Sequence, residues 1–354
     1  MRLVFVTDSL VSGGAERVIS ILANYLSYKQ KVVIICLKKE DVFYAINSNV
    51  TLIHLDDYCQ SKFQKICFLR NYFMVDDIII PFMEPVYCKV MLCLIGKTRI
   101  IIPSERNDPN YMKFRWTFLR RLFMYKISKF VVQTYKIKEY YPKFFQEKIT
   151  VIPNPVEPKQ YTTEPWNRNS KIVLAVARTD VQKNYPMMIK AFCALHKFHP
   201  DYHLEIYGCR DMKSEYVKSL YALIHNLSAD SYIHIHGRVE NVSELYHMAY
   251  MFVMSSDYEG LSNSLIEAMC SGLPVVSTKV SGATDLIVDR ENGLLVDIGD
   301  ENGFSKAMLS LIENQSLAQH LGNNATKCRN TLHKDKICEK WENMLIEYNN
   351  AIKK

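Results

Sequence analysis

Residues 251–277 read Met251-Phe-Val-Met-Ser-Ser-Asp-Tyr-Glu-Gly260-Leu-Ser-Asn-Ser-Leu-Ile-Glu-Ala-Met-Cys270-Ser-Gly-Leu-Pro-Val-Val-Ser277. The first four residues of this stretch are an apolar run of strand length, and a loop follows to Gly260. Ser262 or Asn263 can cap a helix, which Gly272-Leu-Pro274 ends before a second strand begins. This order of strand, loop, helix and strand predicts a parallel α/β sheet.

Two carboxylates in this stretch are candidates for ligand binding. Glu259 lies in the loop and Glu267 on the helix, so both fall at the carboxyl edge of the predicted sheet, where such folds bind ligands. The spacing alone is uninformative, because Glu139 with Glu147 and Glu339 with Glu347 repeat it. A loop acid beside a solvated helix acid remains the alternative.

The chain has 354 residues, which suits two domains rather than one core. Six strand-like runs alternate with helical patterns in each half, the first at Leu3–Thr7 and the seventh at Ile172–Ala177. A proline-rich polar stretch at 153–169 is typical of a linker. We therefore expect domains at 1–158 and 159–332, and a C-terminal helix at 333–354 that packs across both.

Composition narrows the class of protein. Apolar residues make up 48% of the chain and charged residues 23%, as in folded soluble proteins. No run approaches eighteen apolar residues, and the start reads as a strand, so we expect neither a membrane span nor a signal peptide. Ten scattered cysteines without a C-x-x-C pair favour a reducing cytoplasm over disulfides or a metal site.

Positive charge is confined to the first half. Residues 1–158 hold 23 Lys/Arg against 14 Asp/Glu, whereas the remainder holds 21 against 23. Aromatic and apolar residues separate the cations of residues 112–130, which favours an anionic membrane surface over nucleic acid. A helix with a core face and solvated cations remains the alternative. The cations are Lys113, Arg115, Arg120, Arg121, Lys126 and Lys129.

Two loops suit phosphate. Gly13 and Gly14 follow the first strand and precede a helix, whose free N–H groups can bind an anion. Arg178 and Lys183 follow the first strand of the second half, and two cations in such a loop suit a diphosphate. Each loop also has an alternative without phosphate. The two glycines would then only form a tight turn, and the two cations would be solvated side chains.

The chain resembles the retaining glycosyltransferases of family 4 over essentially its whole length. The resemblance rests on the order of three motifs, which are the Gly-Gly loop, Arg178-x4-Lys183-Asn184 and Glu259-x7-Glu267. The resemblance implies the α/β GT-B architecture, two facing Rossmann-like domains with a deep cleft between them. It also implies a nucleotide-diphosphate sugar donor, such as a UDP- or GDP-sugar. The family requires no metal, and a phosphate oxygen of the leaving group is thought to take the acceptor proton.

The resemblance also assigns roles. The backbone at Gly13 and Gly14 would meet the diphosphate, with Arg178 and Lys183 as counter-charges. Glu267 would hold the ribose hydroxyls and Glu259 those of the sugar. The backbone near Gly237, Arg238 and Val239 would contact the base. The sugar pocket would be lined by Gly260, Leu261, Ser262 and Asn263.

One departure concerns the acceptor side. Many relatives carry a histidine after the domain-one strand that faces the sugar, whereas this chain has Ser104-Glu-Arg-Asn-Asp108 there. Glu105 and Arg106 are the candidates for that wall, and a structural ion pair between them is the alternative.

The resemblance therefore implies a transferase that moves a hexose-type sugar to a lipid-linked or growing glycan acceptor. A non-hydrolysing nucleotide-sugar epimerase, or a nucleotide-sugar-binding subunit without turnover, remains open.

Overall fold

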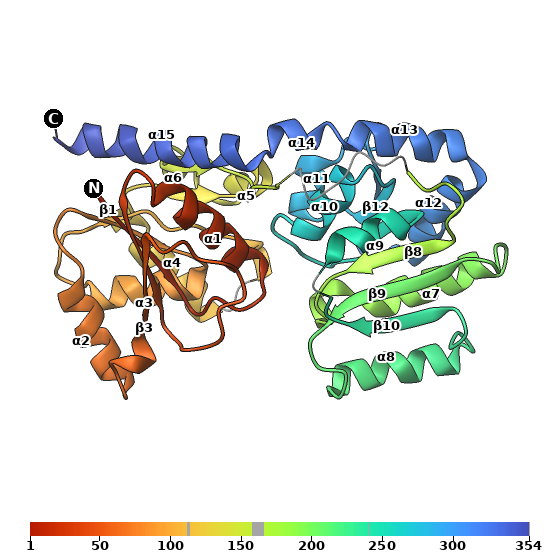
Figure 1. The fold of residues 1–354 in the computed structure, drawn as a ribbon, viewed down its shortest axis with the longest axis horizontal. Helices are drawn as coiled ribbons and strands as arrows, with labels where there is room; N and C mark the ends of the chain where they lie inside the picture. Colours follow the sequence, from red (N-terminus) through yellow and green to blue (C-terminus); the bar gives the residue numbers. More distant parts are fainter. Residues whose placement is uncertain (112–113, 158–165, 240, 354) are drawn as a thin grey trace. The chain divides into compact units, whose positions relative to one another are not determined.

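The computed structural model describes residues 1–111, 114–157, 166–239 and 241–353 (Figure 1). The chain forms two compact units, Met1–Pro155 with Lys334–Lys354 and Val156–His333. The sequence analysis placed the boundaries at 158/159 and 332/333. Val156 belongs to the second unit because its N–H donates to the carbonyl of Leu332 (2.8 Å).

The N-terminal unit contains a parallel sheet in the order β3-β2-β1-β4-β5. Ser104 forms bridges to Phe82 and to Val131, which lead from this sheet to the parallel pair β6-β7. The carboxyl ends of these strands therefore share one edge. The strands are β1 (Arg2–Thr7), β2 (Lys31–Cys36), β3 (Val50–His54), β4 (Asp77–Pro81), β5 (Ile100–Ile101), β6 (Phe130–Val132) and β7 (Ile149–Val151).

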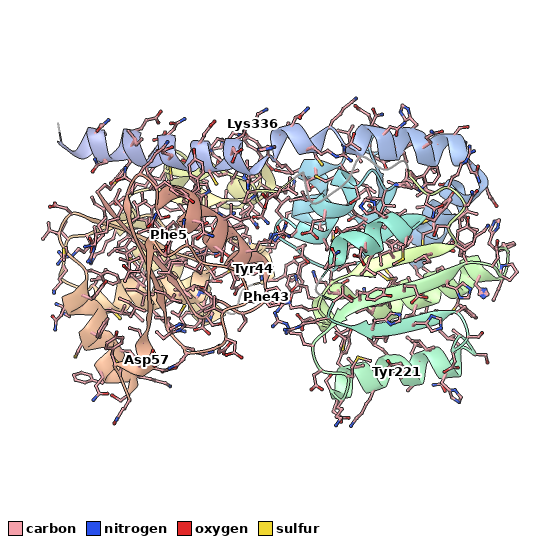
Figure 2. All side chains as sticks on the ribbon, in the orientation of Figure 1. Phe5, Phe43, Tyr44, Asp57, Tyr221 and Lys336 are labelled. Atoms are coloured by element: carbon pink, nitrogen blue, oxygen red, sulfur yellow. The ribbon has the colours of Figure 1, made fainter. Side chains whose placement is uncertain are left out.

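Helices cover both faces of this sheet. Successive residues of β1 point to opposite faces, so Phe5 joins the core under α1 while Val4 and Val6 join the core under α3. Figure 2 labels Phe5 in the interior of the unit. The helices are α1 (Gly14–Leu26), α2 (Lys62–Tyr72), α3 (Glu84–Cys93), α4 (Phe114–Phe123), α5 (Tyr135–Tyr140), α6 (Lys143–Gln146) and α15 (Lys334–Lys353).

The C-terminal helix α15 belongs to the N-terminal unit. Its apolar face carries Trp341, Met344 and Leu345, and all three are buried. Trp341 stacks on Phe82, with 6.2 Å between ring centroids. This apolar face therefore completes the core that α1 and the central strands begin.

The C-terminal unit is a second parallel sheet, in the order β10-β9-β8-β11-β12-β13. The strand order reverses between β8 and β11, and ligands bind at such switch points in open α/β sheets. The strands are β8 (Ile172–Val176), β9 (His203–Cys209), β10 (Ile233–Gly237), β11 (Met251–Met254), β12 (Val275–Thr278) and β13 (Leu294–Val296).

The helices of this unit pack on both faces of the sheet. The helix predicted from residues 262–272 is α10, and its N-cap is Ser262. The set comprises α7 (Tyr185–His196), α8 (Glu215–Asn226), α9 (Val242–Met248), α10 (Asn263–Cys270), α11 (Ser281–Leu286), α12 (Glu301–Glu313), α13 (Gln315–Ala325) and α14 (Cys328–Thr331). Within the described residues, no helix is long and apolar enough to cross a membrane.

The expected α/β fold with parallel sheets is confirmed. The sequence analysis missed β3, an edge strand in which only Val50 and Ile53 are buried. An edge strand contacts one neighbour, so few of its side chains need to be apolar, and its signal in the sequence is correspondingly weak.

Candidate active site

Two loops meet at the switch point of the C-terminal sheet. The loop after β8 ends in a short 3₁₀ turn, Val181–Lys183, and the loop after β11 carries Glu259. The ammonium of Lys183 forms an ion pair with Glu259 Oε2. Their side chains are only 10% and 17% exposed, so water screens this pair weakly. The structure thus brings together one predicted diphosphate ligand and the predicted sugar ligand.

Hydrogen bonds hold the two loops in register. Ser255 Oγ donates to the carbonyl of Lys183 (2.7 Å), and the N–H of Asp257 donates to the carbonyl of Gln182 (2.9 Å). Asn184 adopts the left-handed conformation (φ 46°) and donates through Nδ2 to Asp257 Oδ1 (2.7 Å). Its side-chain oxygen also caps α7, which explains an Asn directly after Lys183.

Gln182 is a residue that the sequence analysis did not single out. Its amide donates to Glu259 Oε2 (3.2 Å) and to the carbonyl of Tyr258 (2.8 Å). Together with Lys183, it fixes the position of the Glu259 carboxylate. Its position next to Lys183 was the signal in the sequence that could have identified Gln182. A glutamine in a loop is too common, however, to indicate a functional residue by itself.

Arg178 lies at the start of the loop after β8. Its guanidinium is half exposed and pairs with Asp180 Oδ2 (3.2 Å). An exposed pair of this kind contributes little to stability. The guanidinium is therefore able to exchange this partner for a phosphate at small cost.

Glu267 is buried on α10, where it is 7% exposed. The hydroxyl of Tyr246, from α9, donates to Glu267 Oε2 (2.9 Å). This hydrogen bond from the tyrosine fixes the orientation of the carboxylate. Tyr246 is a second contact that the sequence did not indicate, since α9 is 21 residues away in the chain.

The Glu259–Gly260 backbone packs tightly against the start of α11. Ser281 Oγ donates to the carbonyl of Glu259 (2.8 Å). A Cβ on Gly282 would lie 1.8 Å from the carbonyl oxygen of Gly260, so only glycine fits there. Gly260, Leu261 and Ser262 are themselves buried, and Asn263 is half-buried.

The predicted base-binding segment begins where β10 ends. The pairing register of β10 with β9 shifts between Ile235 and Gly237, and a shift of this kind re-aims the backbone. Gly237 has open space where a Cβ would point. Arg238 is exposed and Val239 half-buried, so this backbone is accessible at the carboxyl edge.

The Gly-Gly loop of the N-terminal unit opens α1, as predicted. Gly13 is the N-cap, in an extended conformation (φ −171°), and its carbonyl accepts from the hydroxyl of Tyr44 (3.1 Å; Tyr44 is labelled in Figure 2). Glu16 folds back over this end, since its Oε2 lies 2.2 Å from where a Gly13 Cβ would be. An acid there suits the helix dipole, and a diphosphate would have to displace it.

Glu105 and Arg106 do not form an open wall, which corrects the sequence analysis. They are 0% and 8% exposed. Glu105 Oε1 accepts from the backbone N–H groups of Arg106 (2.9 Å) and Asn107 (3.0 Å). Arg106 donates to Asn154 Oδ1 (3.0 Å), and its guanidinium lies over the rings of Phe82 and Trp341. Both side chains therefore organise the loop after β5 from within the unit.

Burial has a measurable consequence at Glu105. Desolvation, and then the charge of Glu84, raise the pKa of Glu105 from 4.5 to about 7. The folded state thus holds this proton more tightly than the unfolded chain does. Its contribution to stability is complete below pH 4.5 and is lost as pH rises through 7.

We expect Glu105→Gln to remove this dependence. Between pH 5 and pH 8 the free energy of unfolding of the wild type should fall relative to the variant, by about 3 kcal/mol for a shift of this size. Denaturant titrations of both proteins at the two pH values measure the difference. If the two proteins differ in free energy of unfolding by the same amount at pH 5 and at pH 8, the pKa of Glu105 is not raised.

The predicted membrane segment is corrected at Arg120. This side chain is 2% exposed and pairs with Glu84 Oε2 (2.8 Å), which is fully buried. Burial of an arginine on a cationic helix requires such an acid, and Glu84 lies 36 residues earlier. Arg121 and Lys126 are exposed and Lys129 is half-buried. Lys113 and the side chain of Arg115 lie outside the described residues.

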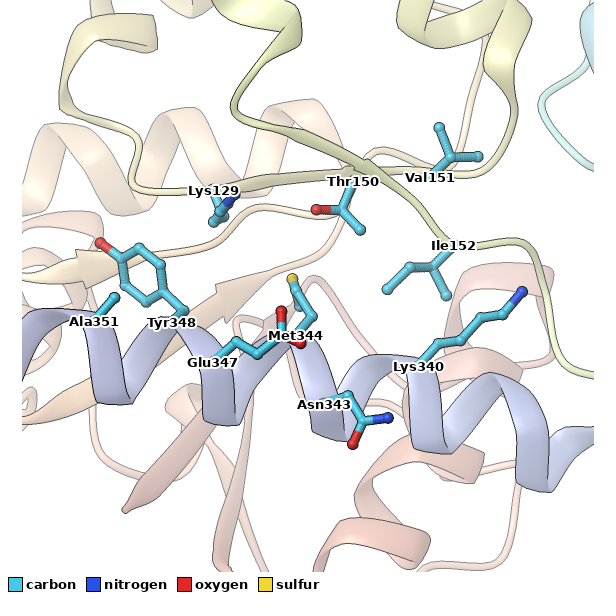
Figure 3. A pocket seen from close by; sticks show the side chains of 10 residues that line it. All are labelled: Lys129, Thr150, Val151, Ile152, Lys340, Asn343, Met344, Glu347, Tyr348 and Ala351. Carbon is cyan, nitrogen blue, oxygen red and sulfur yellow. The ribbon is translucent and has the colours of Figure 1, made fainter.

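A cavity of about 470 Å³ lies in the N-terminal unit between β7 and α15 (Figure 3). Lys129, Lys340 and Glu347 are its charged lining residues, and Met344 and Tyr348 contribute apolar surface. It contains none of the predicted donor or catalytic residues. Lys129 therefore faces α15 rather than belonging with Arg121 and Lys126.

A known family model matches the C-terminal unit. Residues 157–328 match the family model for glycosyl transferases group 1. This segment falls within the C-terminal unit, which holds Lys183, Glu259 and Glu267.

Two curated relatives come from Campylobacter jejuni. The chain is 29% identical to GalNAc-alpha-(1->4)-GalNAc-alpha-(1->3)-diNAcBac-PP-undecaprenol alpha-1,4-N-acetyl-D-galactosaminyltransferase, over 99% of this chain and 100% of that protein. It is also 29% identical to N-acetylgalactosamine-N,N'-diacetylbacillosaminyl-diphospho-undecaprenol 4-alpha-N-acetylgalactosaminyltransferase, over 93% of this chain and 95% of that protein.

Solved structures share the fold. HepE of Anabaena, in complex with UDP and glucose, has a TM-score of 0.82 at 16% identity, over 98% of this chain and 100% of that one. Sucrose-phosphate synthase from Thermosynechococcus elongatus has a TM-score of 0.84 at 16% identity, over 99% of both chains. The GT-B fold with two Rossmann-like units is therefore confirmed.

Proposed function

We propose, from the premise of a GT-B glycosyltransferase that the family match and the relatives support, that the chain is a retaining enzyme of family 4. It moves a hexose-type sugar from a UDP- or GDP-sugar to a lipid-linked or growing glycan in surface polysaccharide biosynthesis. The observation that carries the proposal is the Lys183–Glu259 pair at the switch point of the C-terminal sheet.

The donor-binding roles follow from the positions of the side chains. Lys183 leaves Glu259 for the diphosphate when donor binds, and Arg178 exchanges Asp180 for the same group. Glu259 then accepts hydrogen bonds from hydroxyls of the sugar, and Gln182 keeps it in place. Glu267, oriented by Tyr246, accepts from the ribose hydroxyls.

In the proposed reaction the bond between the sugar C1 and the diphosphate oxygen breaks, and a bond from the acceptor oxygen to C1 forms on the same face. The acceptor proton moves to a phosphate oxygen of the leaving group. Negative charge grows on that group during the reaction. Lys183 and Arg178 stabilise this charge, which lowers the barrier.

The donor is tested first by binding. Thermal unfolding of the protein with a panel of UDP- and GDP-sugars should single out one donor, because a ligand at 100 times its Kd stabilises by about 2.7 kcal/mol. The names of the relatives make UDP-N-acetylgalactosamine the first donor to test.

Transfer is tested with that donor and undecaprenyl-diphosphate-linked glycans. Appearance of the elongated glycan supports the proposal. Conversion of the donor sugar without acceptor would identify an epimerase, and binding without turnover a non-catalytic subunit.

The proposed chemistry uses protein cations in place of a metal. Activity should therefore survive excess EDTA, since Lys183 and Arg178 supply positive charge at the diphosphate. Initial rates with and without chelator measure this, with a Mg²⁺ readdition control. Complete loss that Mg²⁺ restores would contradict it.

For the acceptor we propose docking on the cytoplasmic face of an anionic membrane. The docking surface consists of Arg121 and Lys126 with Phe118, Leu122 and Tyr125, which are 56%, 56% and 76% exposed. Phe118 and Leu122 are one helical turn apart on α4, so they share a face. Exposed apolar side chains beside cations suit a lipid interface, and Arg120 is not part of this surface.

Charge reversal tests the docking surface. Arg121→Glu with Lys126→Glu should reduce binding to vesicles that contain phosphatidylserine, because each lost cation removes roughly 1 kcal/mol of attraction. Co-sedimentation in low and high salt measures it, with Lys306→Glu and Lys327→Glu in the other unit as the matched control. Equal binding of both variants, or binding of the wild type to neutral vesicles alone, would contradict docking through this surface.

A further inference from the structure

Two cysteines meet behind the proposed ribose-binding helix. Cys270 is the last residue of α10 and Cys328 the first of α14, and their Sγ atoms are 3.3 Å apart. All ten cysteines are free thiols. Cys270 is fully buried and Cys328 is half-buried. Cys328 is therefore the more exposed member of the pair.

The backbone around the thiols is held independently of them. Arg329 Nε donates to the carbonyl of Cys270 (2.6 Å). A Cβ on Gly322 would lie 2.3 Å from the carbonyl oxygen of Gly272, so α13 approaches the end of α10 closely. These contacts keep the sulfurs adjacent, and a bond between them needs little rearrangement.

We propose that Cys270 and Cys328 are a redox-responsive pair that a small-molecule disulfide converts into an intramolecular disulfide. Cys328 attacks one sulfur of the small disulfide, whose other half leaves as a thiolate. Cys270 then attacks the Cys328 sulfur and releases the second thiolate. The protein loses two electrons and the small disulfide gains them, while the two cysteine protons pass to the released thiolates.

The order of attack follows from the surroundings of each sulfur. The hydrogen bond with Cys328 and then burial raise the pKa of Cys270, so its thiol stays protonated and is a poor first nucleophile. Cys328 is the more exposed of the two residues, which favours it as the first site of attack. Once Cys328 carries the mixed disulfide, Cys270 is the thiol in contact with it and completes the exchange.

A consequence for the donor site rests on the proposed function. A disulfide holds sulfurs at about 2.05 Å, so its formation draws the end of α10 toward α14 by up to about 1 Å. Glu267 lies three residues before Cys270 on the same helix. Oxidation should therefore alter the affinity for nucleoside diphosphates by several-fold.

The pair is tested on the intact, folded protein. After incubation with excess oxidised glutathione, we expect loss of two titratable thiols, a mass decrease of about 2 Da, and a Cys270–Cys328 cross-linked peptide, all reversed by dithiothreitol. Cys328→Ser should abolish the cross-link, and Cys67→Ser, at another half-buried cysteine, should not. Unchanged thiol content, stable glutathione adducts, or cross-links between other cysteines would overturn the proposal.

A second measurement separates the pair from the donor site. UDP and GDP binding is compared for reduced and oxidised protein, with Cys328→Ser as the control that oxidation should not change. Equal affinity in a protein shown to be cross-linked would overturn the link to Glu267. Absence of nucleotide binding in reduced wild type would instead count against the proposed function, while the peptide mapping still decides the thiol pair.

Discussion

Glu259→Gln should abolish sugar transfer while nucleoside diphosphate affinity stays within a few-fold of the wild type. The proposed contact of Glu259 is with the sugar, so the nucleotide loses no partner when the charge is removed. Glutamine keeps one oxygen at nearly the same place, which preserves the hydrogen bond from Gln182. Calorimetric binding of UDP and GDP, together with initial transfer rates, gives both quantities.

The ion pair with Lys183 makes the choice of variant important. Glu259→Ala would leave the ammonium of Lys183, which is 10% exposed, beside an unoccupied site and could change the loop. Agreement between the glutamine and alanine variants would show that the carboxylate itself is needed. Glu147→Ala is the control and should behave as wild type. Glu147 is exposed, and it follows Glu139 at the same spacing that separates Glu259 from Glu267. Parallel loss of nucleotide binding and transfer in Glu259→Gln would show that Glu259 does not act on the sugar.

The C-terminal fold was predictable because its signals are local. Between Met251 and Ser277 the strand, the Ser262 cap and the Gly272-Leu-Pro274 stop follow one another, and each of them appears in the structure. A parallel sheet places the ends of its strands on one edge, so Lys183 and Glu259 were expected at the same edge. Their contact also requires the pairing of β8 with β11, which the sequence does not indicate.

Long-range contacts were not predictable in this way. Nothing near Arg120 in the sequence shows that it pairs with Glu84, and a charge pattern alone favours a solvated cation. Likewise, the sequence around Glu105 and Arg106 does not show that Phe82 and Trp341 enclose the guanidinium, since Trp341 comes from the C-terminal helix. Burial of a charged residue depends on partners that only the folded chain supplies.

The second large effect is expected at Lys183. Lys183→Ala should lower kcat by about 10²–10³, equivalent to 2.7–4 kcal/mol if the ammonium acts like one oxyanion-hole donor on the leaving diphosphate. Arg178→Ala should have an effect of the same order. Its partner provides the matched control, because Asp180→Asn removes the exposed ion pair but leaves the guanidinium, and should retain activity.

Binding measurements locate the effect on the phosphates. Lys183→Ala should weaken UDP or GDP binding more than binding of the corresponding monophosphate, since the ammonium is assigned to the diphosphate and a monophosphate carries less of that charge. Lys183→Arg, which keeps the charge but changes its geometry, should recover part of the diphosphate affinity. The variant also leaves Glu259 without its cation, and the comparison with Glu259→Gln shows how much of the loss comes from that carboxylate. Wild-type rates in Lys183→Ala would rule out a role at the diphosphate and leave the Lys183–Glu259 pair as a structural contact between two loops.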